Sequence, residues 1–194
     1  RQGRDEAAAL EALASSGARY AAVAERAGLT FRPAAANDFK VLERLPGSAT
    51  TDFGAPGAIA KAEAKPLTTA GADRAEALLR ACWQTFDEVV RKAPPELRKG
   101  PRGGGRDRDQ IAGHVINAEG AYAPKIGVRL QPPAAGDAKA VAEWRDALVT
   151  GLRASPEATA EGGGQRWPPA YAARRLAWHA LDHAWEIEDR TPEG

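Results

Sequence analysis

The chain has 194 residues, of which 43% are hydrophobic and 27% are charged. These values are close to ordinary globular usage, so the chain is long enough to bury a sizeable core and wholesale disorder is disfavoured. Its 27 basic and 26 acidic side chains give a formal net charge of +1 at pH 7. This near balance disfavours nucleic acid and anionic membrane surfaces as partners.

We expect a cytoplasmic protein. No apolar run approaches the roughly 18 residues of a membrane span, and the opening stretch RQGRDEAAAL lacks the apolar core of a secretory signal. The single cysteine, Cys82, excludes an intrachain disulfide and fits a reducing compartment. Because Cys82 lies on the apolar stripe of a predicted helix, we favour a buried hydrophobic role for it over a reactive thiol.

The first 65 residues predict a small extension of α/β character. Residues 5–28 carry apolar side chains at helical spacing and end at Gly28, which predicts one amphipathic helix. The next stretch, NDFKVLERL, alternates Phe39, Val41 and Leu45 with polar neighbours and precedes the turn-rich PGSATTDFGAPG. We therefore expect one or two short strands there.

Residues 66–194 predict a four-helix bundle within a mainly α fold. The expected helices cover residues 68–93, a segment that begins near Asp107 or Asp109 and runs through IAGHVINAEGAYAPKIG, residues 138–153, and residues 169–190. Loops rich in glycine and proline separate them, as in a bundle. The basic loop LRKGPRGGGRDRD is interpreted as a solvated connection, with the binding of an anionic ligand as the alternative.

The last predicted helix contains RRLAWHALDHAWEIEDR, which holds two of the three histidines in the chain. At 100° per residue, a polar seam projects within about 40° of one direction. Its members are Ala172, Arg175, His179, His183, Glu186 and Arg190. Apolar residues flank both sides of this seam, so the histidines are predicted to face inward.

Two imidazoles at positions i and i+4 can converge on one ion while the helix stays regular. The third histidine, His114, lies on the second predicted helix, where Gln110, Asn117 and Ala121 share its face. Three neutral imidazoles from two helices would bind a divalent metal and leave a coordination position open, as in catalytic sites. Zinc and nickel are favoured, and iron or manganese remain alternatives. The competing interpretation is that the histidines are buried and hydrogen-bonded to carboxylates.

The segments RDQIAGHVINAEGAY and HALDH resemble the patterns of the second and last helices in the DinB/YfiT-like superfamily of four-helix-bundle metalloproteins. The resemblance covers about residues 66–190 and implies that His114, His179 and His183 bind a divalent metal. It also implies the transfer or rearrangement of a group with a low-molecular-weight thiol such as mycothiol or bacillithiol, with hydrolysis as an alternative. Ala184 and Trp185 stand where many members continue HxxxHR, which leaves the substrate class open.

These patterns together predict a metal-dependent enzyme that acts on a small-molecule substrate by binding a thiol or a water. Glu119 and Glu186 are the candidate bases or orienting carboxylates, and Asp182 is a further candidate to orient an imidazole. Arg175 is the candidate to bind a carboxylate of the substrate or cofactor, with a salt bridge to a bundle glutamate as the alternative. A non-catalytic metal- or ligand-binding protein of the stress-response type and a purely structural module compete with this prediction. A homodimer is left open.

Overall fold

The computed structural model describes residues 2–52, 54–100, 104–154 and 166–192. Within these ranges the chain is mainly α, as predicted, with seven α-helices and no strand. The α-helices are α1 (Glu6–Ser15), α2 (Gly17–Arg26), α3 (Ala49–Asp52), α4 (Thr69–Lys92), α5 (Arg108–Tyr122), α6 (Ala138–Ala154) and α7 (Pro169–Arg190), and two 3-10 turns are η1 (Ala36–Asp38) and η2 (Ala123–Ile126).

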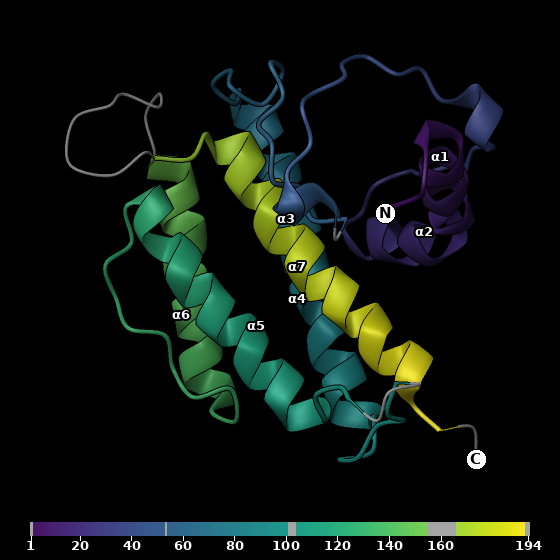
Figure 1. The fold of residues 1–194 in the computed structure, drawn as a ribbon. Helices are drawn as coiled ribbons and strands as arrows, with labels where there is room; N and C mark the ends of the chain where they lie inside the picture. The colour runs from purple at the N-terminus through teal and green to yellow at the C-terminus, as the bar shows by residue number, and fades with distance from the viewer. Residues whose placement is uncertain (1, 53, 101–103, 155–165, 193–194) are drawn as a thin grey trace.

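Four long helices, α4, α5, α6 and α7, lie side by side around a common apolar core (Figure 1). Their first residues carry recognisable start signals. The Thr68 hydroxyl accepts a hydrogen bond from the Gly71 amide, and the Asp137 carboxylate accepts one from the Ala140 amide, so both side chains cap the helices that follow them. Pro169 begins α7, where its missing N–H is not needed.

The helix α7 is the central element of the core, because it packs against α4, α5 and α6. The faces that the sequence periodicity predicts to be inward are buried on all four helices. The largest fully buried apolar side chains in this part of the chain are Leu79 on α4, Ile111 and Val115 on α5, Leu148 on α6, and Leu176 and Ile187 on α7. Burying these side chains supplies the main favourable term in folding.

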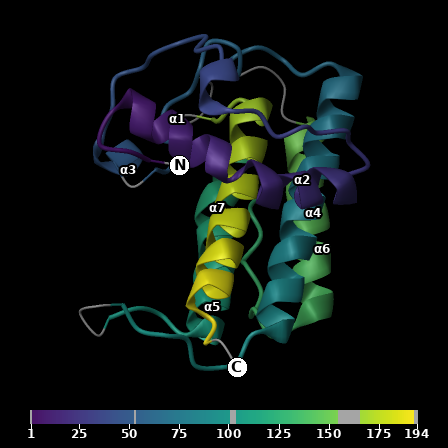
Figure 2. The ribbon, with the colours of Figure 1, turned by 90° about the vertical axis from the view of Figure 1, so that its right-hand side faces the viewer.

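The N-terminal helix α2 packs against α4, and in Figure 2 α1 and α2 are seen in front of the long helices. A second apolar cluster joins α2 to the long helices through Val23 on α2, Cys82 on α4, and Leu181 and Trp185 on α7. The predicted burial of Cys82 is confirmed. Burial raises the pKa of its thiol to about 12, so Cys82 stays protonated at neutral pH and packs as a small hydrophobe.

The single helix predicted for residues 5–28 is wrong, because two helices meet at Ser16 and the chain turns between them (Figure 1). The hydroxyls of Ser15 and Ser16 donate to the carbonyls of Glu11 and Ala12, and hydroxyl groups bonded back in this way bend helices. Gly17 follows, and it is buried against Pro33. The predicted glycine at the C-terminal end is confirmed, since Gly28 adopts a φ of 70°.

The short strands predicted after residue 37 are absent from the described residues of that segment. Instead η1 and α3 interrupt an irregular chain, and Leu42 is 82% exposed. A strand needs a neighbouring strand to pair its backbone groups. Here side chains hold the segment: Arg44 pairs with Glu6, and the Glu43 carboxylate accepts a hydrogen bond from the Lys61 amide. The prediction of α/β character for the first 65 residues is therefore wrong. Their described part consists of helices and irregular connections.

None of the helices in the described parts of the chain combines the length and the apolar character that are needed to cross a bilayer.

A pair of glycine substitutions tests the packing of α6 against η2. A Cβ atom added to Gly151 would lie 2.5 Å from Val128 Cγ2 and 3.0 Å from the Ile126 carbonyl oxygen, whereas one added to Gly113 on α5 meets nothing within 4 Å. Both Gly→Ala changes gain about 1 kcal/mol in helix propensity. Overpacking then makes Gly151→Ala less stable than Gly113→Ala by about 1–3 kcal/mol in urea denaturation. Equal stabilities of the two variants would contradict this packing.

Candidate metal centre

The three histidines converge where α5 packs against α7. One potential ligand atom from each of His114, His179 and His183 lies within 4.8 Å of the others. The ring centroids are 5.1 Å apart for His114 and His179, 4.9 Å for His114 and His183, and 4.6 Å for His179 and His183. The convergence that the sequence spacing predicts is therefore confirmed, and the group is close enough to bind one metal ion.

The cluster is buried on one side only. His179 is 6% exposed, because α7 carries it toward the core, whereas His114 and His183 are partly exposed. His179 and His183 are one helical turn apart on the same face of α7, and His114 approaches them from α5. The cluster therefore lies at the boundary between the core and the solvent.

Glu186 orients His183. The Glu186 carboxylate accepts a hydrogen bond from His183 Nδ1 at 2.7 Å, and Arg190 Nη1 donates to the other carboxylate oxygen at 2.7 Å. Because an ionised carboxylate can only accept, Nδ1 carries the hydrogen, which leaves Nε2 as the nitrogen of His183 for a metal ion. A carboxylate behind an imidazole in this way is the usual partner of a metal-binding histidine. Glu186 therefore makes the direct contact that its predicted role, the orientation of an imidazole, requires.

The donor atoms fit a divalent ion. His179 Nδ1 is buried and has no hydrogen-bond partner among the described residues, which is costly for a polar atom. Three nitrogens that bind zinc at about 2.0–2.1 Å in a tetrahedral arrangement lie about 3.4 Å from one another. The present separations are at most 4.8 Å, so each pair of nitrogens needs to approach by at most about 1.4 Å to reach this arrangement.

The cluster favours the neutral form of two of its imidazoles, those of His179 and His114. Burial, followed by the neighbouring His183 and His114 rings, lowers the pKa of His179 to about 3. Burial also lowers the pKa of His114, and His183 adds to this effect. A neutral imidazole has a free lone pair, so these two residues are available as metal ligands at neutral pH without first losing a proton.

Arg175 lies beside the cluster, one turn before His179. Its guanidinium carbon is 5.1 Å from the centroid of the Trp178 ring and 5.5 Å from that of Tyr122. Two of its nitrogen atoms, Nε and Nη1, are buried without a hydrogen-bond partner in the parts of the chain that the structure describes. The alternative prediction was a salt bridge between Arg175 and a glutamate, and the described residues form no such salt bridge. A guanidinium held between two rings with unused donors suits a carboxylate.

Sequence reasoning overlooked two further groups near the histidines. Tyr122 was not among the predicted site residues, yet its ring centroid lies 6.0 Å from that of His179. Its position two helical turns after His114 is the signal that indicates a shared face. Arg106 precedes α5, and its positive charge contributes to the lowered pKa of His114 and His179. The site is therefore rich in cationic groups and aromatic rings.

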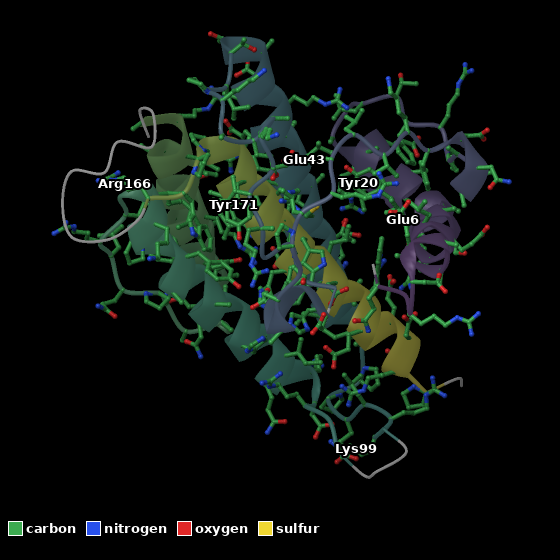
Figure 3. All side chains as sticks on the ribbon, turned by 45° about the horizontal axis from the view of Figure 1, so that its top comes forward. Glu6, Tyr20, Glu43, Lys99, Arg166 and Tyr171 are labelled. Carbon is green, nitrogen blue, oxygen red and sulfur yellow. The ribbon has the colours of Figure 1, made fainter. Side chains whose placement is uncertain are left out.

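The basic loop before α5 is anchored by its own contacts where it is described. Lys99, labelled in Figure 3, forms an ion pair with Asp107 at 2.5 Å. The Arg98 amide donates to the Arg190 carbonyl, so the loop is fastened to the C-terminal end of α7. The Asp107 amide in turn donates to Gln110 at the start of α5. These contacts favour the interpretation of a connection, and residues 101–103 of the loop lie outside the described residues.

Glu119 belongs to a different cluster. Its carboxylate accepts a hydrogen bond from Trp144 Nε1 at 3.1 Å and lies 3.5 Å from Arg145 Nε, so it faces α6. The contacts found for Glu119 within the described ranges include no histidine. Asp182 lies on the side of α7 where it lines an apolar cavity with Trp178 and Trp185. Of the three candidate carboxylates, Glu186 has a hydrogen bond to an imidazole, that of His183, at 2.7 Å.

No known protein family, curated protein or solved structure matches this chain significantly. The function is therefore inferred from the geometry of the site and from the short motifs that carry its histidines.

Substitution of Glu186 tests the orientation of His183. Glu186→Gln removes the charged acceptor, and loss of such a partner weakens metal binding about 10–100-fold. We expect this decrease for zinc in a competition titration with a chromogenic chelator. The matched control is Glu143→Gln, because Glu143 is an exposed residue on α6 whose side chain is 3.9 Å from Lys139. An affinity equal to that of the control would mean that Glu186 plays no part in the metal site.

The environment of Glu119 predicts a pH-dependent stability. Glu119 is 2% exposed, and burial raises the pKa of its carboxyl from 4.5 to about 7 against the opposing effect of Arg145. As pH rises from about 4.5 to about 7, the unfolded chain loses this proton first. The free energy of unfolding of the wild type therefore falls by about 3 kcal/mol relative to Glu119→Gln, and the difference is constant above this window. Urea denaturation of both proteins across this pH range measures it; a difference that does not vary with pH would contradict the buried carboxyl.

Proposed function

We propose that this protein is a divalent-metal-dependent enzyme of the DinB/YfiT-like type, in which residues 66–194 form a four-helix bundle around a three-histidine site. Its reaction is the transfer or rearrangement of a group between a low-molecular-weight thiol, of the mycothiol kind, and a small electrophile. The convergence of His114, His179 and His183 within 4.8 Å is the observation that supports this most directly.

The donor set favours a catalytic site over a closed structural one. Structural zinc sites have four protein ligands, whereas three histidines leave a position for a reactant. Three imidazole nitrogens suit zinc or nickel, with iron or manganese as alternatives. When bound, the ion lowers the pKa of a thiol or of a water and so supplies a nucleophile at neutral pH.

The residues around the histidines have separable roles in this proposal. Glu186 holds the ring of His183 in one tautomer, and burial keeps His179 neutral and ready to bind. Arg175, between Tyr122 and Trp178, binds a carboxylate of the electrophile through its unused Nε and Nη1 atoms. The substrate class proposed here is therefore a small electrophile that carries a carboxylate.

The first measurement is the metal content of protein purified without a histidine tag. We expect about one divalent ion per chain in the wild type and almost none in His179→Ala, because two remaining histidines bind far more weakly than three. Asn117→Ala is the matched control, since Asn117 is an exposed neighbour of His114 on α5.

The second measurement is turnover of carboxylated and neutral electrophiles with mycothiol, bacillithiol or glutathione. His179→Ala should lose at least about 100-fold in kcat/KM.

The variant Arg175→Ala separates binding of the substrate from chemistry. This variant should raise KM about 10–100-fold for a carboxylated electrophile. The KM for a neutral electrophile should not change. A wild type without bound metal would overturn the whole proposal. A wild type with stoichiometric metal that turns over no electrophile, with thiol or with water, would overturn the catalytic part and leave a non-catalytic metal-binding protein.

A further inference from the structure

A cavity of about 660 Å³ lies on another face of α7, between that helix, α4 and the N-terminal segment. Ala173, Ala177 and Leu181 of α7 line it, whereas His179 and His183 do not. Tyr20 of α2, which Figure 3 labels, contributes to its wall. Trp178 lines the cavity and has its ring centroid 5.8 Å from that of His179 in the metal centre.

The wall of the cavity is mainly apolar and partly open to solvent. Phe31 is 40% exposed and Leu13 is 48% exposed, and both side chains belong to the lining. Apolar surface left in water costs about 25 cal/mol for each Å². The volume falls within the range of about 300–1,000 Å³ that is typical of small-molecule sites, and such sites combine an apolar wall with a few polar groups.

The polar groups of this cavity are mostly cationic. Its charged lining residues are Arg32, Arg74, Arg174 and Asp182. Arg174 is neutralised by an ion pair with Glu63. Arg32 and Arg74 form no ion pair with any residue that the structure describes, and the charge of Arg74 acts on the pKa of Tyr20 against the effect of burial. Arg32 and Arg74 are exposed, and two guanidinium groups in the lining of an apolar cavity are complementary in charge to an anionic group on an apolar molecule.

We propose that this cavity binds an amphipathic carboxylate, with its apolar chain between α4, α7 and the N-terminal segment and its carboxylate at Arg32 and Arg74. The binding site is independent of the metal centre, because none of the three histidines lines it. The N-terminal segment thereby has a function of its own: together with α4 and α7 it forms the wall of a ligand site.

Dodecanoate and dodecanol test this proposal, because they share an apolar chain and differ in charge. Both are titrated below the concentrations at which they aggregate, with calorimetry and with the fluorescence of Trp178 and Trp185 as readouts. We expect one dodecanoate per chain with a dissociation constant in the micromolar range. Dodecanol should bind at least about 10-fold more weakly. Metal-depleted protein should bind dodecanoate equally well, so the result is distinguishable from failure of the proposed enzyme.

Two substitutions locate the bound molecule. Ala177→Trp fills the cavity and should abolish binding, whereas Ala121→Trp, at an exposed position on α5, should bind as the wild type does. Arg74→Ala should weaken dodecanoate binding about 10-fold and leave that of dodecanol unchanged. Circular dichroism and thermal unfolding establish that each variant is folded, and Leu78→Trp replaces Ala177→Trp if the latter is not.

Three results would each overturn the proposal. They are the absence of saturable dodecanoate binding to the wild type, unaltered binding to a folded cavity-filling variant, and equal affinities for dodecanoate and dodecanol.

Discussion

The burial of α7 is the constraint on which the rest of the structure depends. The helix packs against α4, α5 and α6, and the N-terminal segment covers a further part of its surface through Leu181 and Trp185. A helix enclosed in this way has few directions left for polar side chains. The polar residues of its inward-facing seam must each find a partner inside the protein or a ligand, whereas Arg174, Glu188 and Asp189 lie on the exposed surface of the helix.

The seam meets this demand only in part: Arg190 Nη2 at one end and several nitrogens at the candidate site have no hydrogen-bond partner among the described residues. Toward its C-terminal end, His183, Glu186 and Arg190 form a chain of hydrogen bonds that ends at the Arg98 carbonyl. Toward its N-terminal end, His179 Nδ1 and two nitrogens of Arg175 remain without partners among the described residues. Burial that lowers the pKa of His179 also strengthens electrostatic attraction for an anion at Arg175. The same environment thus favours a cation at the imidazoles and an anion one turn away.

Helical periodicity predicted the elements that bury a continuous apolar stripe. The last helix was expected over residues 169–190 and is Pro169–Arg190, because its apolar residues recur at the helical period without interruption. The prediction failed in the N-terminal segment for a physical reason. There Ser15, Ser16 and Gly17 break the backbone of a helix whose apolar pattern continues across them, and an alternation of three apolar residues had no second strand to pair with.

The sequence by itself determined that His179, His183 and Glu186 share one face of a helix, since spacing within a helix is a local property of the backbone. Only the tertiary structure decided that His114 approaches them from α5, that Glu119 faces α6, and that the N-terminal segment encloses a cavity beside α4 and α7. These relations depend on how each helix is rotated and inclined against its neighbours. Rotation and inclination follow from the fit of side chains that are far apart in the chain, which no local pattern records.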